Sequence, residues 1–131
     1  PYDTDTGSVR GDLIVLARGV MLLLVGENGD VILRLSTDAR MMPELAPRWE
    51  TFVASNMAST RRIVRRAVAR GELAAGVRVP LLLEALVGAL LMRCLTTPPS
   101  RRARLAQEVD RHVESVVDLV LASAAHLADH P

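Results

Sequence analysis

The feature that most constrains this fold is an apolar stretch, Val79–Leu95, which reads VPLLLEALVGALLMRCL and contains only two charged residues, Glu84 and Arg93. At helical spacing of about 100° per residue, these charges fall on nearly opposite sides and divide the helix into two apolar stripes. The first stripe carries large and medium side chains: Leu83, Leu86, Val87, Leu90, Leu91 and Cys94. The second has small residues at its centre: Leu81, Ala85, Gly88, Ala89, Met92 and Leu95.

Neither stripe is stable in water, because burial of one large apolar side chain contributes about 1.5–3 kcal/mol. We expect the large-residue stripe to face the core of the domain itself. The small-residue stripe should meet the last helix and a second subunit. The stretch therefore predicts a helical module that dimerises.

The chain has the size and composition of one globular domain, with 131 residues of which 50% are hydrophobic and 24% charged. Its net charge of +1 is no signature of nucleic-acid binding. Cys94 is the only cysteine, which excludes an internal disulfide and favours a reducing compartment. No signal peptide is visible, and the longest apolar runs contain a charge and fall short of the roughly 20 residues that span a bilayer. The sequence thus predicts a cytoplasmic protein without a membrane segment.

Apolar residues recur at spacings of three and four along the chain, which predicts an all-α fold of about five helices in an antiparallel bundle. The expected helices cover residues 9–25, 30–41, 44–70, 80–95 and 101–127. Glycine and proline mark the boundaries between them. The last helix should present one wide apolar stripe, formed by Leu105, Val109, Val113, Val116, Val117, Val120, Ala124 and Leu127.

No catalytic or metal-binding motif occurs, because the sequence lacks the H-E-x-x-H, C-x-x-C, P-loop and Rossmann glycine patterns. The histidines, His112, His126 and His130, fall on or near the polar side of the last helix and should be solvated. An arginine-rich segment, residues 61–70, matches the polar face of an amphipathic helix better than a nucleic-acid contact. We therefore predict that the protein is not an enzyme and uses no metal or cofactor.

Two charges lie within otherwise apolar helices. Arg18 either extends outward along its aliphatic stem or pairs inside a cavity. Glu84 should be partly buried and pair with an arginine, or contact a ligand.

A small-molecule pocket is better supported than a catalytic site. Met21, Trp49 and Phe52 lie on helix faces that should point inward, and Asn56 falls in the same sector as a lone polar group. An apolar cavity with one or two convergent polar groups is the usual form of a ligand site. We expect the pocket to be lined by Met21, Trp49, Phe52, Asn56, Leu86 and Leu90. Simple core packing remains the alternative for each of these residues.

The order of these segments resembles the C-terminal domain of TetR-family transcriptional regulators. The likeness is carried by residues 67–73 (AVARGEL) at the end of a long helix, residues 86–90 (LVGAL) in the apolar helix, and the amphipathic helix that follows. Residues 5–8 (DTGS) followed by Asp12 and Leu13 are similar to the junction after the DNA-binding region of that family. The likeness covers almost the whole chain, but the helix-turn-helix that precedes this domain in the family is absent from it.

The resemblance implies a homodimeric one-component regulator, usually a repressor, that a small-molecule effector releases from operator DNA. Residues 1–8 would be the linker remnant, 9–127 the ligand-binding and dimerisation domain, and 128–131 a tail. The helix Val9–Val25 would transmit the effector signal, and operator DNA would be bound only through the absent N-terminal domain. The last two helices would form a four-helix dimer interface, which we assign to Ala85, Gly88, Ala89, Met92, Val113, Val116, Val117 and Val120.

Two alternatives stay open on the sequence. The first is a stand-alone helical dimer that binds a small hydrophobic molecule or a protein partner and has no DNA partner. The second is a small all-α enzyme.

Overall fold

The computed structural model describes residues 5–124, and every regular element within that range is a helix. The chain forms α1 (Val9–Val25), α2 (Gly29–Asp38), a 3-10 turn (Pro43–Leu45), α3 (Ala46–Ala69), α4 (Val79–Thr96), a second 3-10 turn (Pro99–Arg101), α5 (Arg102–Gln107) and α6 (Val109–Ala122). The predicted all-α fold is confirmed. The bounds of α1 agree with the prediction, because Ser8 caps it by accepting a hydrogen bond from the backbone N–H of Gly11 at 3.0 Å.

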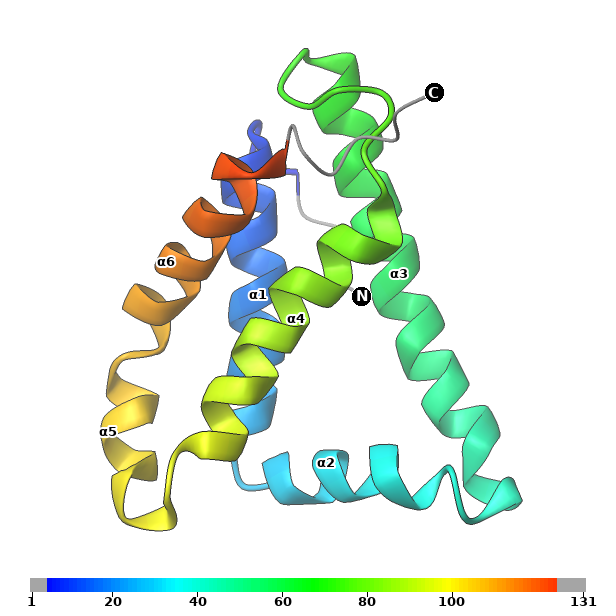
Figure 1. Ribbon diagram of the computed structural model, residues 1–131, viewed down its shortest axis with the longest axis vertical. Coiled ribbons are helices and arrows are strands. Elements are labelled where there is room, and N and C mark those ends of the chain that lie inside the picture. Colours follow the sequence, from blue (N-terminus) through cyan, green and yellow to red (C-terminus); the bar gives the residue numbers. More distant parts are fainter. Residues whose placement is uncertain (1–4, 125–131) are drawn as a thin grey trace.

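Helix α1 is the centre of the fold, since it contacts each of the other helices from α2 to α6. Figure 1 shows α1 between α4 and α6, with α3 on the far side of α4 and α2 crossing the lower edge between α1 and α3. The buried side of α1 includes Leu13, Leu16, Ala17 and Met21, all of which have no exposed surface. These residues recur at spacings of three and four, so one face of α1 supplies the middle of the hydrophobic core.

The large-residue side of α4 is buried, as the sequence predicts, and the small-residue side is largely exposed in the single subunit. Leu83, Leu86 and Leu90 of the large-residue stripe are buried in the domain core. On the small-residue stripe Ala85 and Gly88 are exposed, and Met92 and Leu95 keep 59% and 58% of their surface in solvent. Leu82, which the sequence assigned to neither stripe, is also fully buried.

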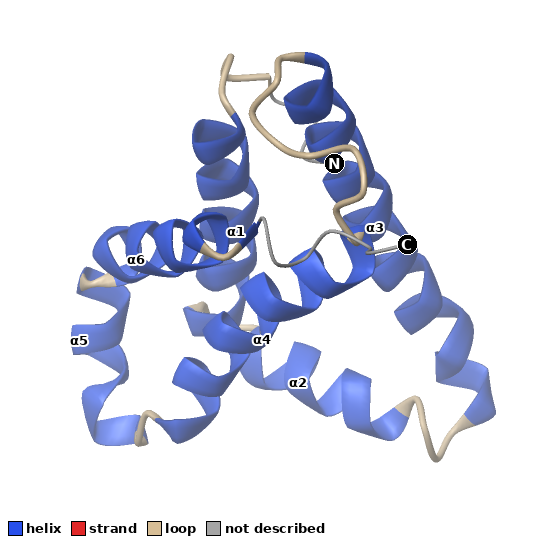
Figure 2. Ribbon diagram, turned by 45° about the horizontal axis from the view of Figure 1, so that its top comes forward, coloured by secondary structure: helices blue, strands red, loops and turns tan. Residues whose placement is uncertain are grey.

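The predicted single helix over residues 101–127 is wrong. The chain forms a 3-10 turn and two helices there, and it leaves helical geometry at Glu108, where φ is −100° and ψ is 8°. Figure 2 shows α5 and α6 meeting at a steep angle. Leu105 before the bend and Val109 after it are both buried, at 7% and 3% exposed. No glycine or proline marks this position, and Leu127, His126 and His130 lie outside the described residues.

The valines assigned to the dimer interface lie elsewhere than expected. Val113, Val116, Val117 and Val120 are 0–5% exposed and belong to the protomer's own core, where α6 packs against α1 and α4. This apolar stripe is used in packing within the domain.

Candidate functional site

A cavity of about 160 Å³ lies where α1, α2, α3 and α4 come together. Helix α2 packs closely against α1 but makes no comparably close contact with α3 or α4, so side chains rather than backbones close the space between them. The wall is formed by Val20, Leu23, Leu24, Ile32, Leu33, Ser36, Trp49, Phe52, Asn56, Val87 and Leu91. None of these residues carries a charge.

Trp49 and Phe52 form the aromatic part of the wall. Their ring centroids are 5.5 Å apart and their planes differ by 26°, which is a stacked arrangement. Both residues belong to α3, three positions apart, so successive turns of one helix place the rings side by side. The pair gives the cavity one aromatic side.

The polar part of the wall consists of Ser36 and Asn56. The Ser36 hydroxyl donates a hydrogen bond to the backbone oxygen of Leu33 at 2.6 Å, so only its acceptor side is left for another molecule. The backbone oxygen of Asn56 accepts from the Thr60 hydroxyl at 2.8 Å, but its side-chain amide has no hydrogen-bond partner within residues 5–124. Asn56 therefore brings both a donor and an acceptor to the cavity wall.

The structure brings together three of the six residues that the sequence assigned to a ligand pocket: Trp49, Phe52 and Asn56. Met21, Leu86 and Leu90 are fully buried in the core and are not part of the cavity wall. The Met21 sulfur instead lies 3.7 Å from the Cys94 thiol, whose pKa is raised by burial.

Most of the cavity wall was not assigned from the sequence. On α4 the wall is formed by Val87 and Leu91, the neighbours of the residues that we expected. Helix α2 contributes Ile32, Leu33 and Ser36, and nothing in its short sequence singles them out. Ile32, Leu33 and Ser36 share one side of α2, but this pattern indicates a cavity only once α2 is known to lie across the end of α1.

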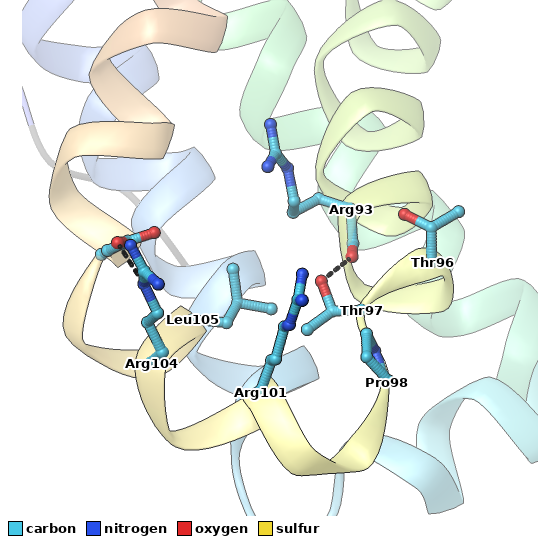
Figure 3. A pocket seen from close by; sticks show the side chains of 8 residues that line it. Arg93, Thr96, Thr97, Pro98, Arg101, Arg104 and Leu105 are labelled. Carbon is cyan, nitrogen blue, oxygen red and sulfur yellow. Dashed lines mark hydrogen bonds and ion pairs between the residues drawn. The ribbon is translucent and has the colours of Figure 1, made fainter.

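A second hollow, of about 390 Å³, lies at the turn between α4 and α5 and has a different character (Figure 3). Arg93, Arg101 and Arg104 surround it, and Leu105 is the buried residue of its lining. Arg104 pairs with Glu108 at 3.2 Å, and the Thr97 hydroxyl donates to the backbone oxygen of Arg93 at 2.6 Å. This hollow is open to solvent and cationic, whereas the cavity beside Trp49 is apolar and more enclosed.

A cluster of charged side chains fixes the N-terminal end of α1. The buried carboxylate of Asp12 accepts hydrogen bonds from the Thr6 N–H at 2.7 Å, the Thr6 hydroxyl at 2.8 Å and Arg66 of α3 at 3.3 Å. Burial alone would raise the pKa of Asp12, but the Thr6 and Arg66 hydrogen bonds together lower it below its ordinary value.

Glu72 extends this cluster from the turn after α3. Its carboxylate accepts a hydrogen bond from the Val9 N–H at 3.0 Å and from Arg70 at 2.5 Å. Both hydrogen bonds lower the pKa of Glu72, and the one from Val9 has the larger effect. A carboxylate at the first turn of a helix is favourable, so Glu72 stabilises the start of α1 from a distant part of the chain.

Other charged or polar residues singled out in the sequence lie outside the cavity wall. Arg18 points outward and pairs with Asp110 of α6 at 2.7 Å, and Glu84 is exposed rather than partly buried. His112 is half-buried rather than solvated; its Nε2 atom has no hydrogen-bond partner among the described residues, and burial lowers its pKa, assisted by Arg93. Within residues 5–124, no three His, Cys, Asp or Glu side chains are grouped so as to hold a metal ion.

Comparison with known proteins supports the resemblance found in the sequence. The family model described as "Tetracyclin repressor-like, C-terminal domain" matches residues 3–120, which is most of the chain. No curated protein and no solved structure gives a significant match. Domains of this family are regulatory rather than catalytic. The chain belongs to the family of tetracycline repressor-like C-terminal domains.

Proposed function

We propose that the chain is the effector-binding and homodimerisation domain of a cytoplasmic one-component transcriptional regulator, a repressor that leaves operator DNA when a small molecule binds. The observation that carries the proposal is the enclosed, uncharged cavity between α1 and α4, in a chain that belongs to a regulatory domain family. An apolar cavity with a few convergent polar groups is the usual form of a small-molecule site. The second hollow, beside Arg93 at the turn between α4 and α5 (the Arg93 hollow), lacks this form because it is open and charged.

The exposed side of α4 supports dimerisation. Among the described helices, α4 alone is long and apolar enough to cross a membrane, with a mean hydropathy of 1.8, yet only 22% of it is buried in the protomer. Core helices of soluble proteins share that composition, but they are mostly buried. A second copy of the chain covering Ala85, Gly88, Met92 and Leu95 would account for the apolar side that the protomer leaves in water.

The proposed interface differs in part from the one that the sequence predicted. It keeps Ala85, Gly88, Ala89 and Met92 of α4. On α6 it uses the outward side, where Leu119 is 68% exposed, in place of the buried valines. Small residues at the centre of α4 allow two helix axes to approach closely.

Helix α1 is the proposed path from effector to DNA. Near the C-terminal end of α1, Val20 and Leu24 line the cavity. Near the N-terminal end of α1, Val9 and Asp12 belong to the charged cluster. An effector that enlarges the cavity therefore displaces a helix whose other end leads toward residues 1–8. Displacing that end in both subunits of a dimer changes the spacing of two DNA-reading domains, which must match successive major grooves.

The test is a thermal-shift screen of a compound library against the wild-type chain and Val87→Phe. A ring at position 87 fills part of the cavity, so effector candidates should stabilise the wild type and fail to stabilise the variant. Compounds that stabilise both proteins equally would place the site elsewhere and contradict the proposal. Size-exclusion chromatography with light scattering on the same samples should show a dimer, and a monomer at all concentrations would contradict the dimerisation half.

A further inference from the structure

The cavity wall restricts the chemistry of the molecule that it accepts. We infer that the ligand is a small neutral phenol, with one ring between the aliphatic and aromatic walls and its hydroxyl group at Asn56. This inference rests on the proposed function, because it concerns the same cavity.

The volume sets the size of the ligand. Cavities for drug-sized molecules have volumes of about 300–1,000 Å³, whereas this cavity has about 160 Å³. An apolar protein cavity of about 150 Å³ holds one benzene molecule. A single six-membered ring with one or two small substituents therefore fits, and a fused-ring molecule does not fit without movement of α2.

The absence of charge from the cavity wall sets the charge of the ligand. No acidic or basic side chain is among the residues that line it. An ion placed there would lose its hydration without gaining a counter-ion, which is strongly unfavourable. Carboxylates such as benzoate are therefore excluded, while phenol is neutral at pH 7 because its pKa is near that of tyrosine, about 10.

The ring pair favours an aromatic ligand over a saturated one. Trp49 and Phe52 stack with centroids 5.5 Å apart and present a fixed aromatic side to the cavity. Aromatic rings gain stabilisation from offset or edge-to-face contact beyond that from area alone. Cyclohexanol has the same hydroxyl group and a similar size but lacks this contact.

The polar groups select a hydroxyl substituent. The Asn56 amide offers a donor and an acceptor and has no side-chain partner within the described chain, while Ser36 offers only its acceptor side. A phenolic hydroxyl can donate to the Asn56 amide oxygen or accept from the amide NH2 group, so it can form a hydrogen bond with Asn56 in either orientation of the amide. A purely apolar ring such as toluene would displace water from the amide without replacing its hydrogen bonds.

The experiment is isothermal titration calorimetry of the chain with phenol, toluene, cyclohexanol and benzoate at pH 7. We expect phenol to bind about five- to tenfold more tightly than toluene or cyclohexanol, the effect of one net hydrogen bond or one aromatic contact, and we expect no binding of benzoate. Asn56→Leu should weaken phenol binding by about five- to tenfold because it removes the hydrogen bond, and it should strengthen toluene binding because toluene no longer desolvates the amide. Val53→Ala, an exposed position on α3 outside the cavity wall, is the matched control and should change neither.

Three outcomes would overturn the inference: benzoate binding as tightly as phenol, an unchanged ratio of phenol to toluene affinity in Asn56→Leu, or no binding of any of the four compounds to the folded protein. Circular dichroism of each variant establishes that it is folded. The thermal-shift screen tests the proposed function separately from the phenol inference. If no phenol binds but a compound from the library stabilises the wild type and not Val87→Phe, the effector site stands and only the phenol inference is wrong.

Discussion

The carboxylate of Glu72 accepts a hydrogen bond from the backbone N–H of Val9 at 3.0 Å, although 63 positions separate the two residues. This contact joins the start of α1 to the turn that follows α3. Because α3 also carries Trp49 and Asn56, one helix connects the cavity wall to the anchored end of α1. Helix α1 is thus linked to α3 at both of its ends, through the cavity wall at one end and through the Glu72 contact at the other.

Removing this anchor should destabilise the domain. We expect Glu72→Ala to lower the urea concentration at the midpoint of unfolding, since it leaves the Val9 N–H without its acceptor and removes the nearest of the carboxylates that pair with Arg70. Urea denaturation followed by circular dichroism measures the change. Glu50→Ala, an exposed position on α3, is the control and should change stability by less than about 0.5 kcal/mol. Equal effects of the two substitutions would refute the anchoring role of Glu72.

The charged cluster should also make stability depend on pH. The pKa of Asp12 lies below its ordinary value of 3.8 in the folded state, so its stabilising contribution is fully present above that value and is lost as the pH falls through the folded pKa. The pKa of Glu72 is also below its ordinary value, so its stabilising contribution is likewise lost as the pH falls. The difference in free energy of unfolding between wild type and Asp12→Asn should therefore be constant from about pH 5 to 7 and shrink below about pH 4. A difference that stays constant down to pH 2 would show that ionised Asp12 gives no stability.

Gly88 tests the dimer surface with little disturbance of the protomer. A Cβ atom built at Gly88 meets no atom within 4 Å, so a larger side chain there projects into open space in the single subunit. We expect Gly88→Leu to leave the protomer folded and to weaken the dimer at least tenfold, as measured by sedimentation equilibrium. Ala54→Leu, an exposed alanine on α3, should leave the dimer intact. A dimer of unchanged affinity in Gly88→Leu would exclude this side of α4 from the interface.

Truncating the ring pair should separate ligand binding from dimerisation. Phe52→Ala removes one of the two stacked rings from the cavity wall, and no residue of that wall belongs to the proposed dimer surface. We expect the affinity for any cavity ligand to fall at least tenfold while the dimer dissociation constant stays within about twofold. Parallel loss of both properties would indicate that Phe52 serves only core packing.

Several elements of this fold were predictable from the sequence because local patterns determine them. The start of α1 follows from the capping position of Ser8, and that of α4 from Pro80 in its first turn. Apolar spacing on α4 distinguished the buried Leu86 and Leu90 from the exposed Gly88 and Met92. Each of these features depends on residues within one or two turns of a helix.

Other features depend on how helices are placed relative to one another, which periodicity does not report. Leu86 packs in the core and Val87 lines the cavity, although they are consecutive residues on the inward side of α4. A small rotation of α4 would therefore change which of them faces the cavity. The bend at Glu108 has no glycine or proline and arises because α6 turns to pack on α1. The same packing buries Val113 and Val117, so an apolar stripe alone did not distinguish a protomer core from a subunit interface.

The central claim is that the effector occupies the cavity between α1 and α4, and methyl NMR tests it most directly. The protein would be labelled at its valine and leucine methyl groups and titrated with a compound that stabilises it in the thermal-shift screen. We expect intermolecular contacts from the ligand to methyl groups of Val20, Leu33, Val87 and Leu91. Contacts to Leu105, beside the Arg93 hollow, without contacts to those four residues would contradict it.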